Sequence, residues 1–173
     1  MDNPSQFDYI IIGAGAAGLM LADAMIKDGF FAEKSILLLD KDAKQTNDRT
    51  WCFWEKGDNL LEELVYKSWE QAHFESDNYS EIFKINPYRY KMIRGLDFYE
   101  FMRKQLSTHK EITWLHTEIE AIDPDGTVTT AKGSYEGNLV FDSTKSANDF
   151  EGVESSISLM QHFKGYFLKT SEP

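Results

Sequence analysis

Six residues near the start of the chain, Gly13-Ala14-Gly15-Ala16-Ala17-Gly18, have the types and spacing that hold a phosphate. They follow an apolar run, Tyr9 to Ile12, that is typical of a buried strand, and they open an apolar stretch that is typical of a helix. A helix N-terminus offers a diphosphate its unpaired N–H groups and the positive end of its peptide dipoles. The pattern predicts a dinucleotide site in which Gly13 turns the chain, Gly15 admits the phosphates and Gly18 lets the helix pack close on the sheet.

An acid at the end of the next strand completes this predicted site. The helix is expected to end near Gly29, and the run Ser35 to Leu39 is typical of a buried parallel strand that finishes on Asp40. Asp40 lies roughly 20 residues after the last glycine, where this fold places the carboxylate that accepts the ribose hydroxyls. Lys41 is grouped with the predicted cofactor contacts, although a solvated loop charge is the alternative. A βαβ unit without a nucleotide is the alternative for the whole motif.

Composition excludes several classes of partner. The chain has 173 residues, with 18 basic and 29 acidic side chains and a formal charge of −11, which disfavours nucleic acid and a broadly basic membrane-docking face. No apolar run approaches the roughly 20 residues that span a bilayer, and the N-terminus lacks a secretory signal pattern. The single cysteine, Cys52, excludes an intramolecular disulfide, and the four histidines lack metal-ligand spacing. We therefore predict no metal.

The middle of the chain predicts a mixed excursion between the strands of the main sheet. Residues 59–69 have the apolar spacing of an amphipathic helix, and residues 97–106 predict a second helix with Asp97 as its N-cap. Runs rich in strand formers predict an antiparallel pair and then a parallel strand followed by a β-meander: 81–85, 88–94, 112–115, 118–122, 127–130, 134–135 and 139–142. A further strand is expected within 161–169.

Several segments together resemble the FAD-dependent lycopene cyclases of carotenoid biosynthesis, in their bacterial β-cyclase branch. The matching segments are Asp8 to Ile12 leading into Gly13 to Gly18, Asp48-Arg49-Thr50-Trp51-Cys52-Phe53-Trp54, Tyr88 to Gly95 with Phe98-Tyr99, Val140 to Ser143, and Gln161-His162-Phe163-Lys164-Gly165-Tyr166. The glycine motif is shared by many oxidoreductases, whereas the segments that begin at Asp48 and at Gln161 are more particular to cyclases. Members of the family run well beyond residue 173, so the chain resembles an N-terminal part.

The resemblance implies an α/β fold, with a Rossmann-like FAD/NAD(P)-binding parallel sheet, helices and a β-meander, followed by an incomplete second region. We expect residues 1–150 to form the FAD-binding domain, with an inserted excursion at about 55–110, and residues 151–173 to begin a substrate region. The implied cofactor is reduced FAD, with NAD(P)H as its electron source. The implied reaction turns the linear ψ end groups of lycopene into β-ionone rings by proton-initiated cyclisation without net redox.

The remaining candidate residues each have a structural alternative. Arg49 could reach the diphosphate or pair with Asp48 at the surface. Trp51 and Trp54 could line an aromatic wall beside a carbocation or belong to a core cluster. Arg94 could face the flavin ring or end a strand in water, and Ile119 could contact the adenine through its backbone or fill a buried strand position. No carboxylate stands out as the proton donor, so the catalytic residue stays unassigned.

Two other functions stay open at this point. One is an FAD-dependent monooxygenase or other oxidoreductase with the same N-terminal half, and the other is a nucleotide-binding fragment without catalysis. Because carotenes dissolve in membranes, we expect the complete protein to be cytoplasmic and peripherally associated with a membrane. The ring type, the number of cyclised ends and the oligomeric state do not follow from the sequence.

Overall fold

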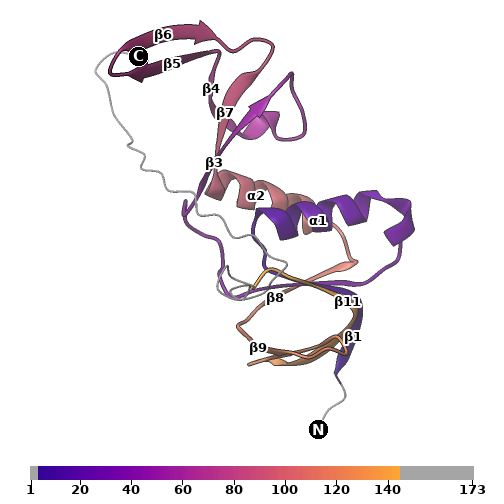
Figure 1. Cartoon of the computed structure of the whole chain (residues 1–173). Coiled ribbons are helices and arrows are strands. Elements are labelled where there is room, and N and C mark those ends of the chain that lie inside the picture. Colours follow the sequence, from indigo (N-terminus) through magenta and orange to yellow (C-terminus); the bar gives the residue numbers. More distant parts are fainter. Residues whose placement is uncertain (1–3, 145–173) are drawn as a thin grey trace. The chain divides into compact units, whose positions relative to one another are not determined.

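The computed structural model describes residues 4–144, and its main element is a six-stranded sheet (Figure 1). Its strand order is β8-β2-β1-β11-β10-β9. The first four strands in this order are mutually parallel, and the last three form an antiparallel meander. This confirms the predicted α/β fold with a β-meander. The strands are β1 (Ser5–Ile12), β2 (Ile36–Asp40), β8 (Ile112–His116), β9 (Ile119–Ile122), β10 (Thr127–Thr130) and β11 (Gly133–Asp142).

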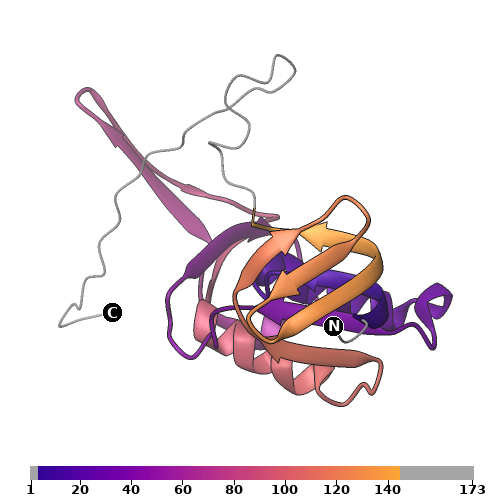
Figure 2. The same cartoon turned by 90° about the horizontal axis from the view of Figure 1, so that it is seen from below.

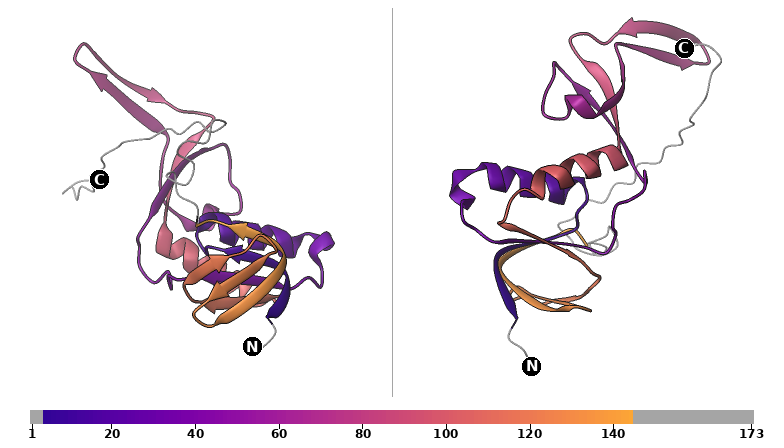
Figure 3. Two further views of the ribbon diagram at one scale, coloured as in Figure 1. Left: turned by 60° about the horizontal axis from the view of Figure 1, so that its bottom comes forward. Right: turned by 180° about the vertical axis from the view of Figure 1, so that it is seen from behind.

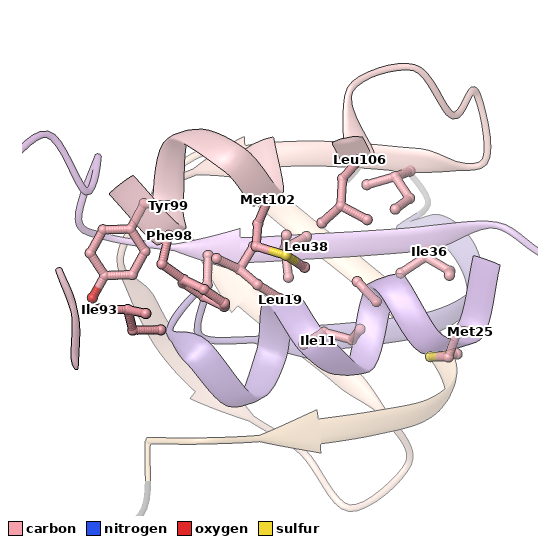
Figure 4. Packing of buried hydrophobic residues seen from close by; sticks show 13 residues of the cluster. Ile11, Leu19, Met25, Ile36, Leu38, Ile93, Phe98, Tyr99, Met102 and Leu106 are labelled. Carbon is pink, nitrogen blue, oxygen red and sulfur yellow. The ribbon is translucent and has the colours of Figure 1, made fainter. Parts of the chain in front are cut away.

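Two helices, α1 (Ala16–Lys27) and α2 (Gly95–Leu106), lie against one face of this sheet (Figure 3). A short 3-10 turn, η1 (Gly29–Phe31), follows α1. The helices and strands meet in a core whose members are almost fully shielded from solvent (Figure 4). Its centre consists of Ile11, Leu19, Ile36, Leu38, Phe98, Met102 and Leu106.

The opposite face of the parallel strands has a second core. Side chains alternate across a strand, so Ile10, Ile12, Leu37 and Leu39 point away from the helices and pack around Val128 of the meander. Figure 2 shows the meander strands, in orange, in front of the parallel strands. Burial on both faces explains why β2 is a continuous apolar run and does not alternate with polar residues.

Gly18 determines how closely α1 approaches the sheet. A Cβ atom at this position would lie 1.9 Å from the backbone oxygen of Gly13 and 3.2 Å from a side-chain carbon of Ile11. Gly137 in β11 plays a similar part, because its Cβ would lie 2.8 Å from Ile10. The close packing predicted for Gly18 is therefore confirmed.

The segment between β2 and β8 contains α2 and two small antiparallel sheets. One has the order β3-β7-β4 and the other pairs β5 with β6. Their elements are β3 (Thr50–Glu55), the 3-10 turn η2 (Glu62–Leu64), β4 (Val65–Trp69), β5 (Gln71–Ser76), β6 (Tyr79–Lys84) and β7 (Arg89–Arg94).

The helix predicted for 59–69 is wrong. Residues 62–64 form only the η2 turn, and its last residue Leu64 and the preceding Leu61 pack against the main core. From Val65 the chain pairs with β7, and Trp69 lies opposite Tyr90. Valine, tyrosine and tryptophan favour strands, and pairing with a strand distant in the sequence decided against the helical spacing.

Three further expectations need correction. The strands predicted at 81–85 and 88–94 exist, but β6 pairs with β5, and β7 lies between β3 and β4. The N-cap of α2 is Arg94, and Asp97 lies in the first helical turn. The two short strands expected at 134–135 and 139–142 are one continuous strand, β11, because Gly137 lets the backbone pass close to β1 without interruption. The expected domain boundary near residue 150, the strand within 161–169 and the Gln161–Tyr166 segment lie outside the described residues.

We expect Gly18→Ala to destabilise the chain by about 1–3 kcal/mol, because the added methyl group meets backbone that cannot move independently. Gly29→Ala is the matched control, since a Cβ there has no neighbour within 4 Å. Urea unfolding followed by circular dichroism measures both. Equal stability of the two variants would contradict the packing role of Gly18.

Candidate functional site

The turn from β1 into α1 exposes a set of backbone amides. Gly13 has φ +104°, a conformation that favours glycine, and its N–H donates to the Leu39 carbonyl at 2.7 Å. The first hydrogen bond within the helix runs from the Leu19 N–H to the Gly15 carbonyl at 3.0 Å. The N–H groups of Ala16, Ala17 and Gly18 therefore have no acceptor within the helix, and no side chain of residues 4–144 caps them.

Gly15 leaves open space in front of these amides. It is the N-cap of α1, and a Cβ built on it would meet no atom of the described residues within 4 Å. Its φ of −77° is accessible to any residue, so backbone strain does not require glycine there. Glycine has a different advantage at this position, because a side chain would occupy the space that a phosphate needs.

Asp40 lies beside this cradle, at the end of β2. One of its carboxylate oxygens accepts a hydrogen bond from the Ala14 N–H at 2.6 Å, and the other accepts from the Asp42 N–H at 2.7 Å. Its side chain is 16% exposed. These two hydrogen bonds fix the orientation of the carboxylate. Because each carboxylate oxygen can accept more than one hydrogen bond, Asp40 can still accept one from a hydroxyl.

A cavity of about 300 Å³ opens next to Asp40, at the carboxyl ends of β2 and β8. In open α/β sheets, ligands bind outside the carboxyl ends of the strands. The lining combines apolar side chains with charged ones from the loop after β2 and from α2. It includes Ala14, Leu38, Asp40, Asp42, Lys44, Tyr99, Arg103, Trp114 and His116.

Two predicted cofactor contacts lie outside this lining. The Lys41 side chain is 73% exposed, and its ammonium is 3.8 Å from a carboxylate oxygen of Glu118. The Arg49 side chain is 67% exposed and lies 3.7 Å from Asp48, which is the ion pair considered as its alternative. The structure brings neither basic group to the cavity.

The aromatic candidates separate into a core residue and an exposed one. Trp51 packs edge-on against Phe98 and Tyr99 of α2, with ring centroids 5.3 and 5.7 Å away, so it belongs to the core. Trp54 is 57% exposed and lies against Tyr90, with the ring centroids 4.7 Å apart. The two tryptophans alternate along β3 and therefore lie on opposite faces of its sheet.

Arg94 and Ile119 have partners that correspond to their structural alternatives. The Arg94 guanidinium donates to both carboxylate oxygens of Asp97, at 2.7 and 2.9 Å, and its central carbon lies 4.4 Å from the centre of the Tyr66 ring. The hydrogen bonds to Asp97 raise the pKa of Arg94 further above its ordinary value. Ile119 in β9 packs against the second core.

Several cavity residues were not among the sequence candidates. Tyr99 and Arg103 share one face of α2 at i, i+4 spacing, which is the signal that could have found them. Lys44 follows β2 closely, and Trp114 belongs to β8. The indole N–H of Trp114 is buried and has no hydrogen-bond partner among the residues that the structure describes. These residues meet only because α2 packs beside β2.

Within residues 4–144, no cluster of three or more potential ligands could hold a metal ion. The same range contains no helix with the length and apolar character needed to cross a membrane.

The parallel sheet, the amide cradle and the acid at the end of β2 define a protein with a Rossmann-like nucleotide-binding fold. A family model described as lycopene cyclase protein matches residues 8–173. The chain therefore belongs to the lycopene cyclase family.

Solved structures with a similar fold include a probable FAD-dependent monooxygenase, an oxygenase and a flavin-dependent brominase. The chain is similar to PqsL of Pseudomonas aeruginosa, whose structure is described as that of a probable FAD-dependent monooxygenase, with 14% identity and a TM-score of 0.62 over 91% of this chain and 48% of that one. It is also similar to 2-methyl-3-hydroxypyridine-5-carboxylic acid oxygenase, with 18% identity and a TM-score of 0.58 over 80% of this chain and 39% of that one.

A third similar structure is the flavin-dependent brominase Bmp2, with 14% identity and a TM-score of 0.58 over 84% of this chain and 40% of that one. The chain thus spans less than half the length of these structures. No curated protein matches the sequence.

Tyr99 should make the stability depend on pH in the alkaline range. Burial, followed by the charge of Asp48, raises its pKa from 10.0 to about 12. Between these values the folded chain keeps a proton that the unfolded chain releases, so the free energy of unfolding falls as pH rises from about 10 to about 12.

Over that range, the free energy of unfolding should fall by up to about 2 kcal/mol less in Tyr99→Phe than in the wild type. Urea unfolding at pH 9 and pH 11.5 measures this difference. Tyr88→Phe, at a half-exposed tyrosine, is the control. The same alkaline loss in Tyr99→Phe and in the wild type would contradict the assignment.

Proposed function

We propose that this chain is the FAD-binding part of a lycopene cyclase. The observation that supports this most directly is the amide cradle at Gly15, open in front and flanked by Asp40, in a chain of the lycopene cyclase family. The residues fit the cofactor: three amides without an acceptor in the helix suit a diphosphate, and a fixed carboxylate suits the ribose hydroxyls.

The chain's own residues would bind and orient the cofactor. The amides of Ala16, Ala17 and Gly18 would hold the diphosphate, and Asp40 would accept from the ribose. In the reduced form maintained by NAD(P)H, the bound flavin would supply negative charge near a carbocation. We keep Trp54, whose ring is exposed, as a proposed residue of the substrate side.

The proposed reaction is an isomerisation of lycopene. A terminal double bond of a ψ end group gains a proton, the next double bond attacks the resulting tertiary cation, and loss of a proton leaves a β-ionone ring. The atoms of the substrate are conserved and no net electrons move.

The described residues offer no evident acid for the first step. The carboxylates of Asp23 and Glu55 are shielded from solvent, but each forms an ion pair with a lysine, Lys27 and Lys91 respectively. Both carboxylates are thus engaged with a cation, and neither lines the cavity next to the cradle. The catalytic residue therefore stays unassigned.

An FAD-dependent monooxygenase is the second candidate, and the likeness of the fold to PqsL and to an oxygenase favours it. The two functions differ in stoichiometry, because a monooxygenase consumes NAD(P)H and oxygen in proportion to its product.

Since lycopene dissolves in bilayers, the cyclase proposal also includes a cytoplasmic protein that contacts the membrane surface.

The cradle can be tested by binding alone. We expect Gly15→Ala to weaken FAD binding at least about tenfold, because a methyl group takes the space of the diphosphate and blocks charge-assisted hydrogen bonds. Gly29→Ala, which also adds a methyl group in open space, should bind FAD like the wild type. Isothermal titration calorimetry measures both variants, and equal affinities would argue against the cradle.

The reaction can be tested with the complete gene product, lycopene in vesicles and reduced FAD. We expect β-ring products by chromatography, with consumption of NAD(P)H and oxygen far below one equivalent per ring. Unchanged lycopene with fully loaded flavin would contradict the cyclase proposal. Consumption of one equivalent per product would favour the monooxygenase.

A further inference from the structure

Two lysines follow strand β2, and the structure places them in different surroundings. Lys41 is exposed and points to Glu118 at the surface. Lys44 lines the cavity next to the cradle, and its side chain is only 16% exposed. The position of a largely shielded lysine beside a proposed anion site requires an explanation.

The loop after β2 is built to turn Lys44 inward. Lys44 has φ +51°, a left-handed conformation that is uncommon for a residue with a side chain. Its N–H donates to an Asp42 carboxylate oxygen at 2.8 Å. The preceding carbonyl, of Ala43, accepts from the Arg103 guanidinium of α2 at 2.7 Å. Both hydrogen bonds hold the peptide group between Ala43 and Lys44, so the backbone that leads into Lys44 is fixed.

The Lys44 ammonium lies among anionic and aromatic groups without close hydrogen bonds to them. It is 3.8 Å from an Asp40 oxygen and 3.6 Å from an Asp42 oxygen, and it lies 5.7 Å from the centre of the Tyr99 ring. These distances exceed the roughly 2.7–3.2 Å of a good N–H to oxygen hydrogen bond. The same two carboxylates accept much shorter bonds from backbone amides. Within residues 4–144, Lys44 thus forms ion pairs with both acids but no short hydrogen bond, so its N–H donors can turn to a ligand.

The balance of charges around the cavity points to a function for Lys44. A dinucleotide diphosphate brings two negative charges close to Asp40 and Asp42, which already bring two. Arg103 and Lys44 are the lysine and arginine side chains that line this cavity within residues 4–144, and Arg103 is engaged with Ala43. An ammonium beside these acids, in the cavity next to the cradle, offsets the repulsion that the carboxylates would exert on the diphosphate.

We propose that Lys44, and not Lys41, is the basic residue that binds the diphosphate of the dinucleotide, with Arg103 as the positioning residue that holds its loop. This inference rests on the proposed function. The sequence had suggested Arg49 for the diphosphate and Lys41 as a further cofactor contact, and neither side chain lines the cavity.

The test compares ligands with and without phosphate. Calorimetry on the 173-residue chain measures Kd for ADP and for adenosine in the wild type, Lys44→Met, Lys44→Arg and Lys41→Met. We expect Lys44→Met to weaken ADP binding about tenfold or more and to change adenosine binding less than about twofold. Lys44→Arg should keep most of the ADP affinity, and Lys41→Met should match the wild type.

Salt provides a second readout. Raising ionic strength should weaken ADP binding more in the wild type than in Lys44→Met, because the variant has lost the charge that is screened. Thermal unfolding confirms that each variant is folded, and retained adenosine binding confirms that the cavity is intact.

Each outcome has a separate meaning. Equal or tighter ADP binding by Lys44→Met, or an equal loss for ADP and adenosine, overturns the role of Lys44 and leaves the proposed function standing. Absence of both ADP and FAD binding in the wild type overturns the proposed function, and the inference with it.

Discussion

The close approach of α1 to β1 is the constraint on which the rest of this structure depends. Gly18 has no side chain, so the helix lies directly against the Gly13 backbone at the end of the strand. A helix held further out would present its first amides away from the sheet edge. The same approach positions Leu19 over Ile11 and Leu38, and it thereby connects the cradle to the main core (Figure 4).

The hydrogen bond from the Ala14 N–H to Asp40 joins the cradle to the second strand. Because β1 and β2 pair from Tyr9–Ile36 to Ile12–Leu39, the acid that follows β2 comes out beside the turn that follows β1. The parallel register therefore aligns an amide donor with a carboxylate. The loop after β2 then brings Lys44 back toward the same place, which concentrates opposite charges at one edge of the sheet.

Patterns within one continuous stretch were predictive. The glycine motif, the apolar run before Asp40 and the helical spacing from Phe98 to Leu106 depend on local geometry and on burial of both sheet faces, and the structure agrees with each. Patterns whose outcome depends on a partner distant in the sequence gave wrong or incomplete predictions. Leu60 to Trp69 has helical spacing, yet half of it is a strand because β7 offers it backbone partners. Trp51 and Trp54 looked alike until the pleat of β3 placed one in the core and the other at the surface.

By itself the sequence determined the class of the fold, the position of the cradle and the acid that faces it. These follow from short spacings that few other arrangements satisfy. Only the tertiary structure decided which charged side chains reach the cavity. Lys41 and Lys44 lie three positions apart with the same chemistry, and their difference arises from the left-handed turn at Lys44 and from an arginine on α2, some sixty residues away along the chain. Contacts between segments so distant have no local signature, because they exist only after the helix has packed on the sheet.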